Sequence, residues 1–500
     1  MKKFRKVELT RRSYHAEPAR DSVHRSSLTV PEISGTVAEI SFVNHFLLKR
    51  NYTRVGCRIS GIGQDGARIG SRLFEISEPR VHRYRLTGMF DDDVSTYLVE
   101  FFAAENLFIP FPAVIINHWG SDFINSVHAY NRSLNDVFED EAISQVTVRE
   151  ASIDVMRGNG FETFLVFAAG PMGYRGELDI ELAREKEIHH ALFALDVSRY
   201  TSHTLNLSDI LPDAPDEPGG VLKIRAGRQP MFFGRMLAGI RTASGAFSGN
   251  HSYYDSSETE EYWDDGAASA RLYPLFKGIR ARVRVYPIMS PGTLNIAIAL
   301  HGPDVRCLET LPVGQVVSPG NVVLDVSLHD VIERSSTGTE DVAGFAMIAQ
   351  PAGARTPTRI NHQLLYEAGG LASSINTSLL NPNVFTPENK PGYSWGQLVL
   401  GARFETSLGI GCLNPTGADD EIEVALYDET GPRTSRRWCI PSGGVLTLDP
   451  LRDFDVKFEQ SDAAEPQYVW YIAKGSRADL TAYTVTRDIE SNHCTGEHAF

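Results

Sequence analysis

A unit of about 120 residues recurs four times along this chain, and this recurrence limits the fold more than any other feature. Each copy opens with a run of alternating apolar and polar residues, reaches a cluster of turn-forming residues, and continues with a second alternating run. The first runs are 37–47, 161–169, 279–288 and 404–413, and the second runs are 53–59, 177–182, 293–300 and 421–427. Alternation with a period of two buries one face of a strand and exposes the other, which is typical of antiparallel sheets.

The turn cluster between the two runs predicts a β-hairpin in each copy. These clusters lie at 49–51, 170–173, 290–292 and 414–417. Convincing helical stretches are nearly absent, and short strands in units of this size are typical of an immunoglobulin-like sandwich. We therefore expect an all-β protein of four tandem antiparallel β-sandwich (immunoglobulin-like) domains, each with its own hydrophobic core.

The boundaries between domains are placed in the polar stretches that separate the copies. The expected organisation is a basic N-terminal arm (1–26) followed by β-sandwich 1 (27–143), β-sandwich 2 (144–267), β-sandwich 3 (268–393) and β-sandwich 4 (394–500). The polar stretches lack the Gly/Ser runs of a flexible tether, so neighbouring sandwiches are expected to touch.

The charge is unevenly distributed along the chain. The chain has 48 Lys or Arg and 63 Asp or Glu, a net charge of −15, whereas residues 1–26 hold eight basic and three acidic residues. An acidic body argues against nucleic acid as the main partner, because phosphate binding needs concentrated positive charge. The basic arm is interpreted as a solvated terminus, with contact to an anionic surface as the alternative.

The lack of a recognisable targeting signal and the wide spacing of the cysteines predict a cytoplasmic protein. The residues after the basic start offer no apolar stretch typical of a signal peptide, and no apolar run reaches the length of a membrane span. The five cysteines are far apart and show no C-x-x-C spacing. We therefore expect reduced thiols, a cytoplasmic location and no transmembrane segment.

A small polar cluster closes each copy and contains a histidine in three of them. These histidines are His128, His251 and His498, and the third copy has Asn376 at the corresponding place. Neutral imidazole is a favoured metal ligand, so the three histidines are candidate metal ligands. The favoured interpretation is that each histidine ends an edge strand and hydrogen-bonds a backbone group.

Acidic residues gather at the joints between copies, where calcium is the candidate ion. Asp264 and Asp265 are the candidate ligands, because carboxylate oxygens are the donors that calcium prefers. The spacing lacks the order of an EF-hand loop, and a solvated acidic surface is the default interpretation. No other cofactor is expected.

Aromatic residues near the closures are candidates for carbohydrate binding. The candidates are Trp119, Tyr130, Tyr253 and Trp263, because an exposed aromatic face can stack on a sugar ring. Most of these aromatic side chains are nevertheless expected to pack in the cores or joints.

The sequence contains none of the usual catalytic signatures: no phosphate-binding loop, no dinucleotide-binding fingerprint and no H-E-x-x-H. No catalytic residue is assigned. The favoured hypothesis is a non-enzymatic structural or interaction protein that assembles with itself or docks a protein partner. A carbohydrate-binding protein with calcium at the domain joints is the first alternative, and a metal-dependent enzyme is the second.

Overall fold

The structure is a computed structural model. It describes residues 24–500 except 91–92, 110–111, 134–145, 230, 256–259, 304–306, 339–340, 380–391, 414–418, 442, 455–464 and 476–478. For residues 146–147, 228–229, 231–233, 412–413 and 479 it describes the backbone alone. Residues 1–23 of the expected basic arm and the expected boundary at 143 lie outside the described residues, as does most of the joint before residue 393.

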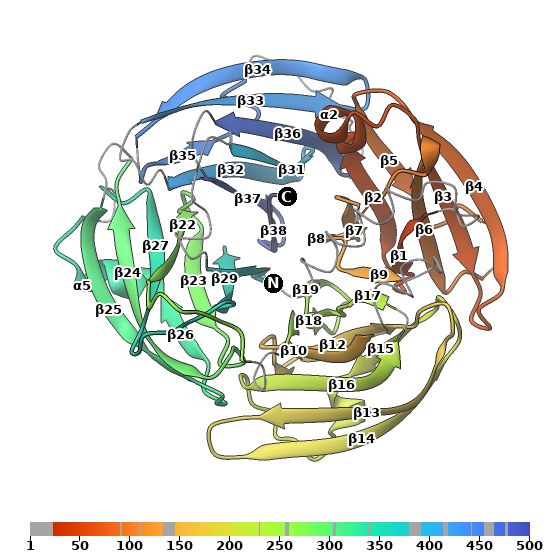
Figure 1. The fold of residues 1–500 in the computed structure, drawn as a ribbon, viewed down its shortest axis with the longest axis horizontal. Coiled ribbons are helices and arrows are strands. Elements are labelled where there is room, and N and C mark those ends of the chain that lie inside the picture. Colours follow the sequence, from red (N-terminus) through yellow and green to blue (C-terminus); the bar gives the residue numbers. More distant parts are fainter. Residues whose placement is uncertain are drawn as a thin grey trace. The chain divides into compact units, whose positions relative to one another are not determined.

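The described chain is nearly all β with antiparallel sheets, which confirms the all-β part of the predicted fold class (Figure 1). The strands fall into four successive segments, each of which forms two antiparallel sheets. The described helices are short: α2 (His45–Arg50), α4 (Leu207–Ile210), α5 (Leu328–Arg334) and the 3-10 turn η1 (Ala104–Asn106).

The first segment forms one sheet of order β17-β9-β1-β6-β3-β4 and another of order β5-β2-β7-β8. Its strands are β1 (Ser26–Pro31), β2 (Val37–Val43), β3 (Val55–Ile62), β4 (Arg68–Ile76), β5 (Val81–Arg85), β6 (Thr96–Ala103), β7 (Ile115–Trp119), β8 (Ile124–His128) and β9 (Asn131–Ser133).

The second segment forms the sheets β14-β13-β16-β10-β20 and β11-β12-β18-β19, and β15 pairs with β12. Its strands are β10 (Val146–Ser152), β11 (Arg157–Gly158), β12 (Phe161–Ala168), β13 (Tyr174–Ala183), β14 (Ile188–Val197), β15 (Ser202–Asn206), β16 (Val221–Gln229), β17 (Met231–Gly234), β18 (Leu237–Thr242), β19 (Phe247–His251) and β20 (Tyr253–Tyr254).

The third segment forms the sheets β22-β27-β24-β25 and β26-β23-β29-β30, with a small β21-β28 pair. Its strands are β21 (Tyr262–Trp263), β22 (Ser269–Pro274), β23 (Arg280–Val285), β24 (Gly292–His301), β25 (Cys307–Ser318), β26 (Leu324–Ser327), β27 (Gly344–Pro351), β28 (Thr356–Pro357), β29 (Asn361–Glu367) and β30 (Ser373–Ser378).

The fourth segment forms the sheets β31-β36-β33-β34 and β35-β32-β37-β38. Its strands are β31 (Gly392–Leu400), β32 (Phe404–Leu413), β33 (Asp420–Asp428), β34 (Gly431–Ile440), β35 (Val445–Leu448), β36 (Gln467–Gly475), β37 (Asp479–Asp488) and β38 (Cys494–His498).

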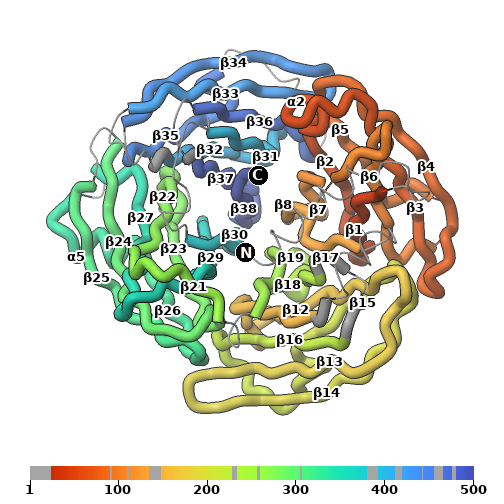
Figure 2. Tube along the Cα trace, viewed as in Figure 1, coloured from red at the N-terminus to blue at the C-terminus, as the bar shows by residue number. Residues whose placement is uncertain are grey.

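The same pairing order recurs in all four segments, as the tube trace in Figure 2 lets the reader follow. Apart from the short extra strands, one sheet joins the first, sixth, third and fourth strands of the segment, and the other joins the fifth, second, seventh and eighth. In the fourth segment, for example, these orders are β31-β36-β33-β34 and β35-β32-β37-β38. The sequence repeat is therefore a repeat of topology.

The predicted hairpin between the two alternating runs of each copy is wrong. The first run becomes the second strand of its segment and the second run becomes the third strand, and these two strands belong to different sheets. The hairpins instead join the third and fourth strands, as in the unbroken ten-pair register of β13 with β14. Alternation shows that one face of a strand is buried, but it does not show which strand lies beside it.

In the first copy, the strand formed by the first alternating run (37–47) also ends earlier than the alternation predicts. Strand β2 stops at Val43 and the chain turns into α2. The side chain of Asn44 accepts a hydrogen bond from the backbone N–H of Leu47, which caps the helix start. Asn51 ends the helix in the left-handed conformation at φ 56°, which asparagine tolerates better than most residues.

The described chain separates into two compact units. The first unit comprises Met1–Gly120 and Ser126–Tyr254, and the second comprises Ser121–Asn125 and Asp255–Phe500. In the first unit, β17 from the second segment pairs with β9 of the first segment and so extends its sheet. In the second unit, the core of the third segment includes Tyr483 and Val485 from β37 of the fourth. This continuity differs from the expectation of four separate cores.

Candidate functional site

The closure motifs end equivalent strands. Strands β8, β19 and β38, each the eighth strand of its segment, end at His128, His251 and His498 respectively. The repeat in sequence therefore places each histidine at the same point of the topology.

The His251 side chain is hydrogen-bonded to the backbone of the next residue. Its Nδ1 lies 2.7 Å from the carbonyl oxygen of Ser252, and 2% of the residue is exposed. His498 in the second unit repeats this contact, with its Nδ1 2.8 Å from the carbonyl oxygen of Ala499. The backbone hydrogen bond of the favoured interpretation is thus present at both histidines.

His128 and His251 lie together in the first unit. Their ring centroids are 4.7 Å apart in an edge-to-face arrangement. A carbonyl bonded to Nδ1 of His251 favours the proton on that nitrogen and leaves Nε2 as the atom with a lone pair. The pair supplies two of the three or four protein ligands that zinc takes. A metal-binding role for the closure histidines stays a prediction.

The acidic candidates at the third segment interact with neighbouring protein groups. An oxygen of Asp264 lies 3.3 Å from Nε of Arg355. Asp265 Oδ1 accepts a hydrogen bond from the backbone N–H of Ala267 at 3.0 Å and another from the Thr356 hydroxyl at 3.4 Å. These contacts stabilise the segment of chain that precedes β22. Calcium binding by the two carboxylates stays a prediction.

Three of the four aromatic candidates are buried, in agreement with the core or joint packing expected for most of them. Trp119 is 9% exposed, and Tyr130 and Tyr253 are 4% exposed. Only Trp263 is half-buried. The indole Nε1 of Trp119 donates a hydrogen bond to Glu39 inside the fold. Sugar stacking needs an open aromatic face, so carbohydrate binding stays a prediction without that support.

Histidines outside the closures make stability depend on pH. Burial lowers the pKa of His45 and of His362 to about 3, and that of His82 and of His118 to about 4. Each is neutral when folded and takes up a proton near its ordinary pKa of about 6.5 when unfolded.

We therefore expect the free energy of unfolding to fall as the pH drops from about 6.5 toward about 4, by roughly 1 kcal/mol per buried histidine at pH 5.5. Urea denaturation at pH 7.5, 6.5 and 5.5 measures this loss. A His118→Gln variant should lose less stability over this interval than the wild type. His329→Gln, at an exposed helix position, is the control and should keep the full loss. Identical losses in all three proteins would contradict the assignment for His118.

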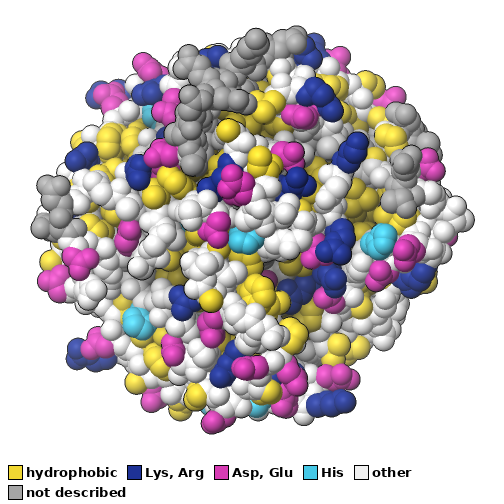
Figure 3. All heavy atoms as spheres, turned by 180° about the vertical axis from the view of Figure 1, so that it is seen from behind, with side chains coloured by type: hydrophobic (Ala, Val, Ile, Leu, Met, Phe, Trp, Pro, Cys, Tyr) yellow, Lys and Arg dark blue, Asp and Glu magenta, His cyan; other side chains and the backbone are white. Residues whose placement is uncertain are grey.

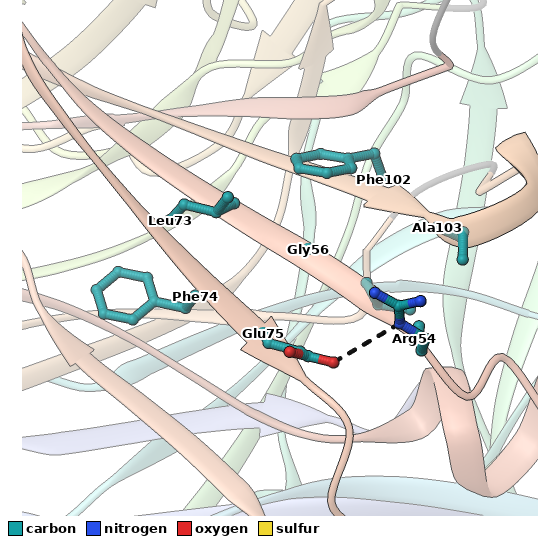
Figure 4. Close-up of a pocket in the computed structure, with 9 residues that line it drawn as sticks. Arg54, Gly56, Leu73, Phe74, Glu75, Phe102 and Ala103 are labelled. Atoms are coloured by element: carbon teal, nitrogen blue, oxygen red, sulfur yellow. Dashed lines mark ion pairs between the residues drawn. The ribbon is translucent and has the colours of Figure 1, made fainter.

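A shallow hollow opens on the outer face of the first sheet (Figure 4). Its volume is about 250 Å³, and its lining includes Gly56, Leu73 and Phe102 from β3, β4 and β6. Arg54 and Glu75 lie across it with their charged groups 3.8 Å apart. A side chain at position 56 would place its Cβ 2.6 Å from the Phe102 ring, so glycine keeps this hollow open. The hollow is not predictable from the sequence, because it depends on the register of three strands.

Four long edge strands are the other feature that sequence analysis missed. Strands β4, β14, β25 and β34 each end a sheet. Large apolar side chains are exposed on three of them: Leu73 at 67%, Ile188 and Leu192 at 59%, and Val317 at 57%. An edge strand presents backbone N–H and C=O groups to which another strand can pair. On the face shown in Figure 3, charged side chains of both signs are interspersed with apolar ones.

No helix among the described residues combines the length and apolar character needed to span a bilayer.

Comparison with known proteins identifies no family for this chain. No protein-family model matches the chain, and no curated protein matches it. Among solved structures, the M60 catalytic domain with the CBM51-1 and CBM51-2 domains from Clostridium perfringens ZmpB matches at 9% identity and a TM-score of 0.13, over 92% of this chain and 54% of that chain. This chain thus spans about half the length of that structure. Such a low TM-score carries no argument about fold or function.

Proposed function

We propose that this chain is a non-enzymatic structural or interaction protein of four tandem immunoglobulin-like β-sandwich modules, and that it self-associates through strand β14. The modules correspond to the four segments, with the boundaries expected from the sequence. The shared pairing order supports this reading, because one eight-stranded arrangement is repeated four times.

The regularity of β14 is the observation that carries the proposal. The pairings of the edge strands β4, β25 and β34 with their inner neighbours β3, β24 and β33 contain bulges, and bulges discourage the pairing of a further strand at the edge. The register beside β14 is unbroken over ten pairs. Strand β14 also exposes Ile188 and Leu192. Among the described residues no strand pairs with its outer edge.

A second copy of this chain is the proposed occupant of that edge. Two β14 strands can pair antiparallel across a two-fold axis, which is the commonest symmetry of soluble oligomers. Such pairing would give each copy backbone hydrogen bonds along the strand and would cover Leu192. Prolines on the other edge strands, Pro312 in β25 and Pro432 in β34, lack the N–H that such pairing needs.

The full-length chain is expected to dimerise, and Leu192→Lys is expected to shift the dissociation constant at least tenfold toward the monomer. A charge at this position would have to be desolvated in the paired strands. Sedimentation velocity over a range of protein concentrations measures the effect. Val317→Lys, at a similarly exposed position on the proline-containing edge β25, is the control and should associate like the wild type. A wild-type chain that stays monomeric at every concentration, or equal behaviour of the two variants, would overturn the proposal.

A further inference from the structure

Three arginines surround one buried carboxylate on the outer face of the first sheet. Glu100 lies on β6 with its side chain 3% exposed. Arg58 on β3 contacts both of its oxygens, through Nε at 2.6 Å and Nη2 at 2.8 Å. Arg25 and Arg68 approach the same carboxylate less closely, at 3.5 Å and 3.8 Å. Both oxygens of Glu100 are thus already engaged by Arg58.

The arginines bring more positive charge than Glu100 neutralises. Three guanidinium groups and one carboxylate leave a surplus of two positive charges. The Nε of Arg25 is buried and has no hydrogen-bond partner among the described residues. Burial raises the pKa of Tyr200, the Glu100 charge raises it further, and Arg25, Arg68 and Arg199 lower it. A fourth guanidinium group, that of Arg199, therefore acts on the same neighbourhood. Like charges held this close repel one another where water screens them incompletely.

The equivalent place in the second segment carries a smaller positive surplus, although Arg149 on β10 lies in register with Arg225 there. There the third and sixth strands, β13 and β16, carry two cations and two carboxylates. Lys223 lies 2.9 Å from Glu181, and Arg225 lies 3.6 Å from Asp179. Three cations thus share two carboxylates in the second segment, whereas three share one in the first, in a chain whose net charge is −15.

The cluster is open to solvent on one side. The side chains of Arg25, Arg58 and Arg68 are 34%, 27% and 44% exposed. The apolar hollow lies on the same face, because Gly56 and Phe102 are each two residues from Arg58 and Glu100 along their strands. That spacing is about 7 Å. A ligand on the arginines would therefore have an apolar surface beside it.

We propose that Arg25, Arg58 and Arg68 bind a doubly charged tetrahedral oxyanion, a phosphate or sulfate group. Guanidinium groups donate paired hydrogen bonds that match the oxygens of such anions. Arg58 stays bonded to Glu100 and is held in place by it, whereas Arg25 and Arg68 have donors to turn toward the ligand. The hollow at Leu73 accommodates the apolar part of a phosphate or sulfate ester. The site goes beyond the proposed self-association, and neither proposal depends on the other.

Isothermal titration calorimetry of the full chain with inorganic phosphate, sulfate and phenyl phosphate, at constant ionic strength in chloride, tests this site. The wild type is expected to bind the dianions, and Arg68→Gln is expected to weaken binding about tenfold or more, because it removes charge-assisted hydrogen bonds. Arg175→Gln is the matched control and should bind like the wild type. Arg175 is 85% exposed and forms an ion pair on the outer sheet of the second segment. Phosphate and sulfate heats no different from those of added chloride, or equal affinity in the two variants, would overturn the proposal.

Thermal denaturation separates loss of the site from loss of the fold. Without dianions, Arg68→Gln is expected to melt at the wild-type temperature or above it, because it relieves repulsion. With phosphate present, the wild type should gain stability as the logarithm of the phosphate concentration, and the variant should not. A variant that melts lower than the wild type without phosphate and gains as much from phosphate as the wild type would contradict the site.

Leu73→Ser distinguishes a free anion from an ester as the natural occupant. If the hollow takes the apolar part, phenyl phosphate binds the wild type more tightly than inorganic phosphate does, and Leu73→Ser removes that difference while leaving the affinity for inorganic phosphate unchanged. Equal affinities of the wild type for both compounds would refute the hollow as part of the site.

Discussion

Arg83→Ala is expected to lower the free energy of unfolding by about 3–5 kcal/mol, because it strands a buried carboxylate without its partner. Glu39 on β2 has a side chain 1% exposed, and Nη2 of Arg83 contacts its two oxygens at 2.8 Å and 3.0 Å. Trp119 donates a further hydrogen bond to the same carboxylate at 3.1 Å. One indole N–H cannot replace a guanidinium group, so the variant loses two charge-assisted hydrogen bonds to a buried carboxylate.

Urea denaturation at pH 7 measures this loss, and a second substitution identifies its cause. Adding Glu39→Gln to Arg83→Ala removes the stranded charge, so the double variant should recover part of the lost stability. Arg175→Ala, which breaks an ion pair exposed on both sides, should cost less than about 1 kcal/mol. A double variant less stable than Arg83→Ala alone would show that the packing of the arginine, and not the buried charge, is what matters.

The sequence predicts the repeat and the strand content but not the pairing. Alternation over 177–182 correctly places Leu178, Ile180 and Leu182 in a core, where all three are fully buried. The same alternation cannot tell whether the strand pairs with the run before it or the run after it, since both carry the same pattern. The predicted hairpins therefore failed, although the strands themselves were in the right places.

The candidate site was predicted only in part, for a related reason. The equivalent ends of three strands follow from the recurring closure motif, so the histidine positions were accessible from sequence. The arginine cluster was not, because Arg58 and Glu100 are 42 residues apart and become neighbours only through the register of β3 with β6. The partner of the buried Trp119 indole was equally hidden, because Glu39 is 80 residues away in sequence and becomes a neighbour only through the pairing of β7 with β2.

The continuity between the third and fourth segments predicts that a single core substitution destabilises both. Tyr483 lies on β37 of the fourth segment, is fully buried, and packs in a core composed mostly of third-segment residues. Its ring centroid is 5.3 Å from that of Tyr273 on β22. Tyr483→Ala is expected to cost about 3–5 kcal/mol, as large aromatic truncations in well-packed cores do.

Because the cavity would open in a core shared by two segments, both should lose protection together. Hydrogen exchange followed by mass spectrometry at increasing urea is expected to show faster exchange in 262–378 as well as 392–498 for Tyr483→Ala. Ile422→Ala is the control, since Ile422 is fully buried in a core composed of fourth-segment residues, and its effect should begin in 392–498. Faster exchange confined to 392–498 in Tyr483→Ala would mean that the two segments unfold independently, and that the aromatic contact between them adds packing without making their unfolding cooperative.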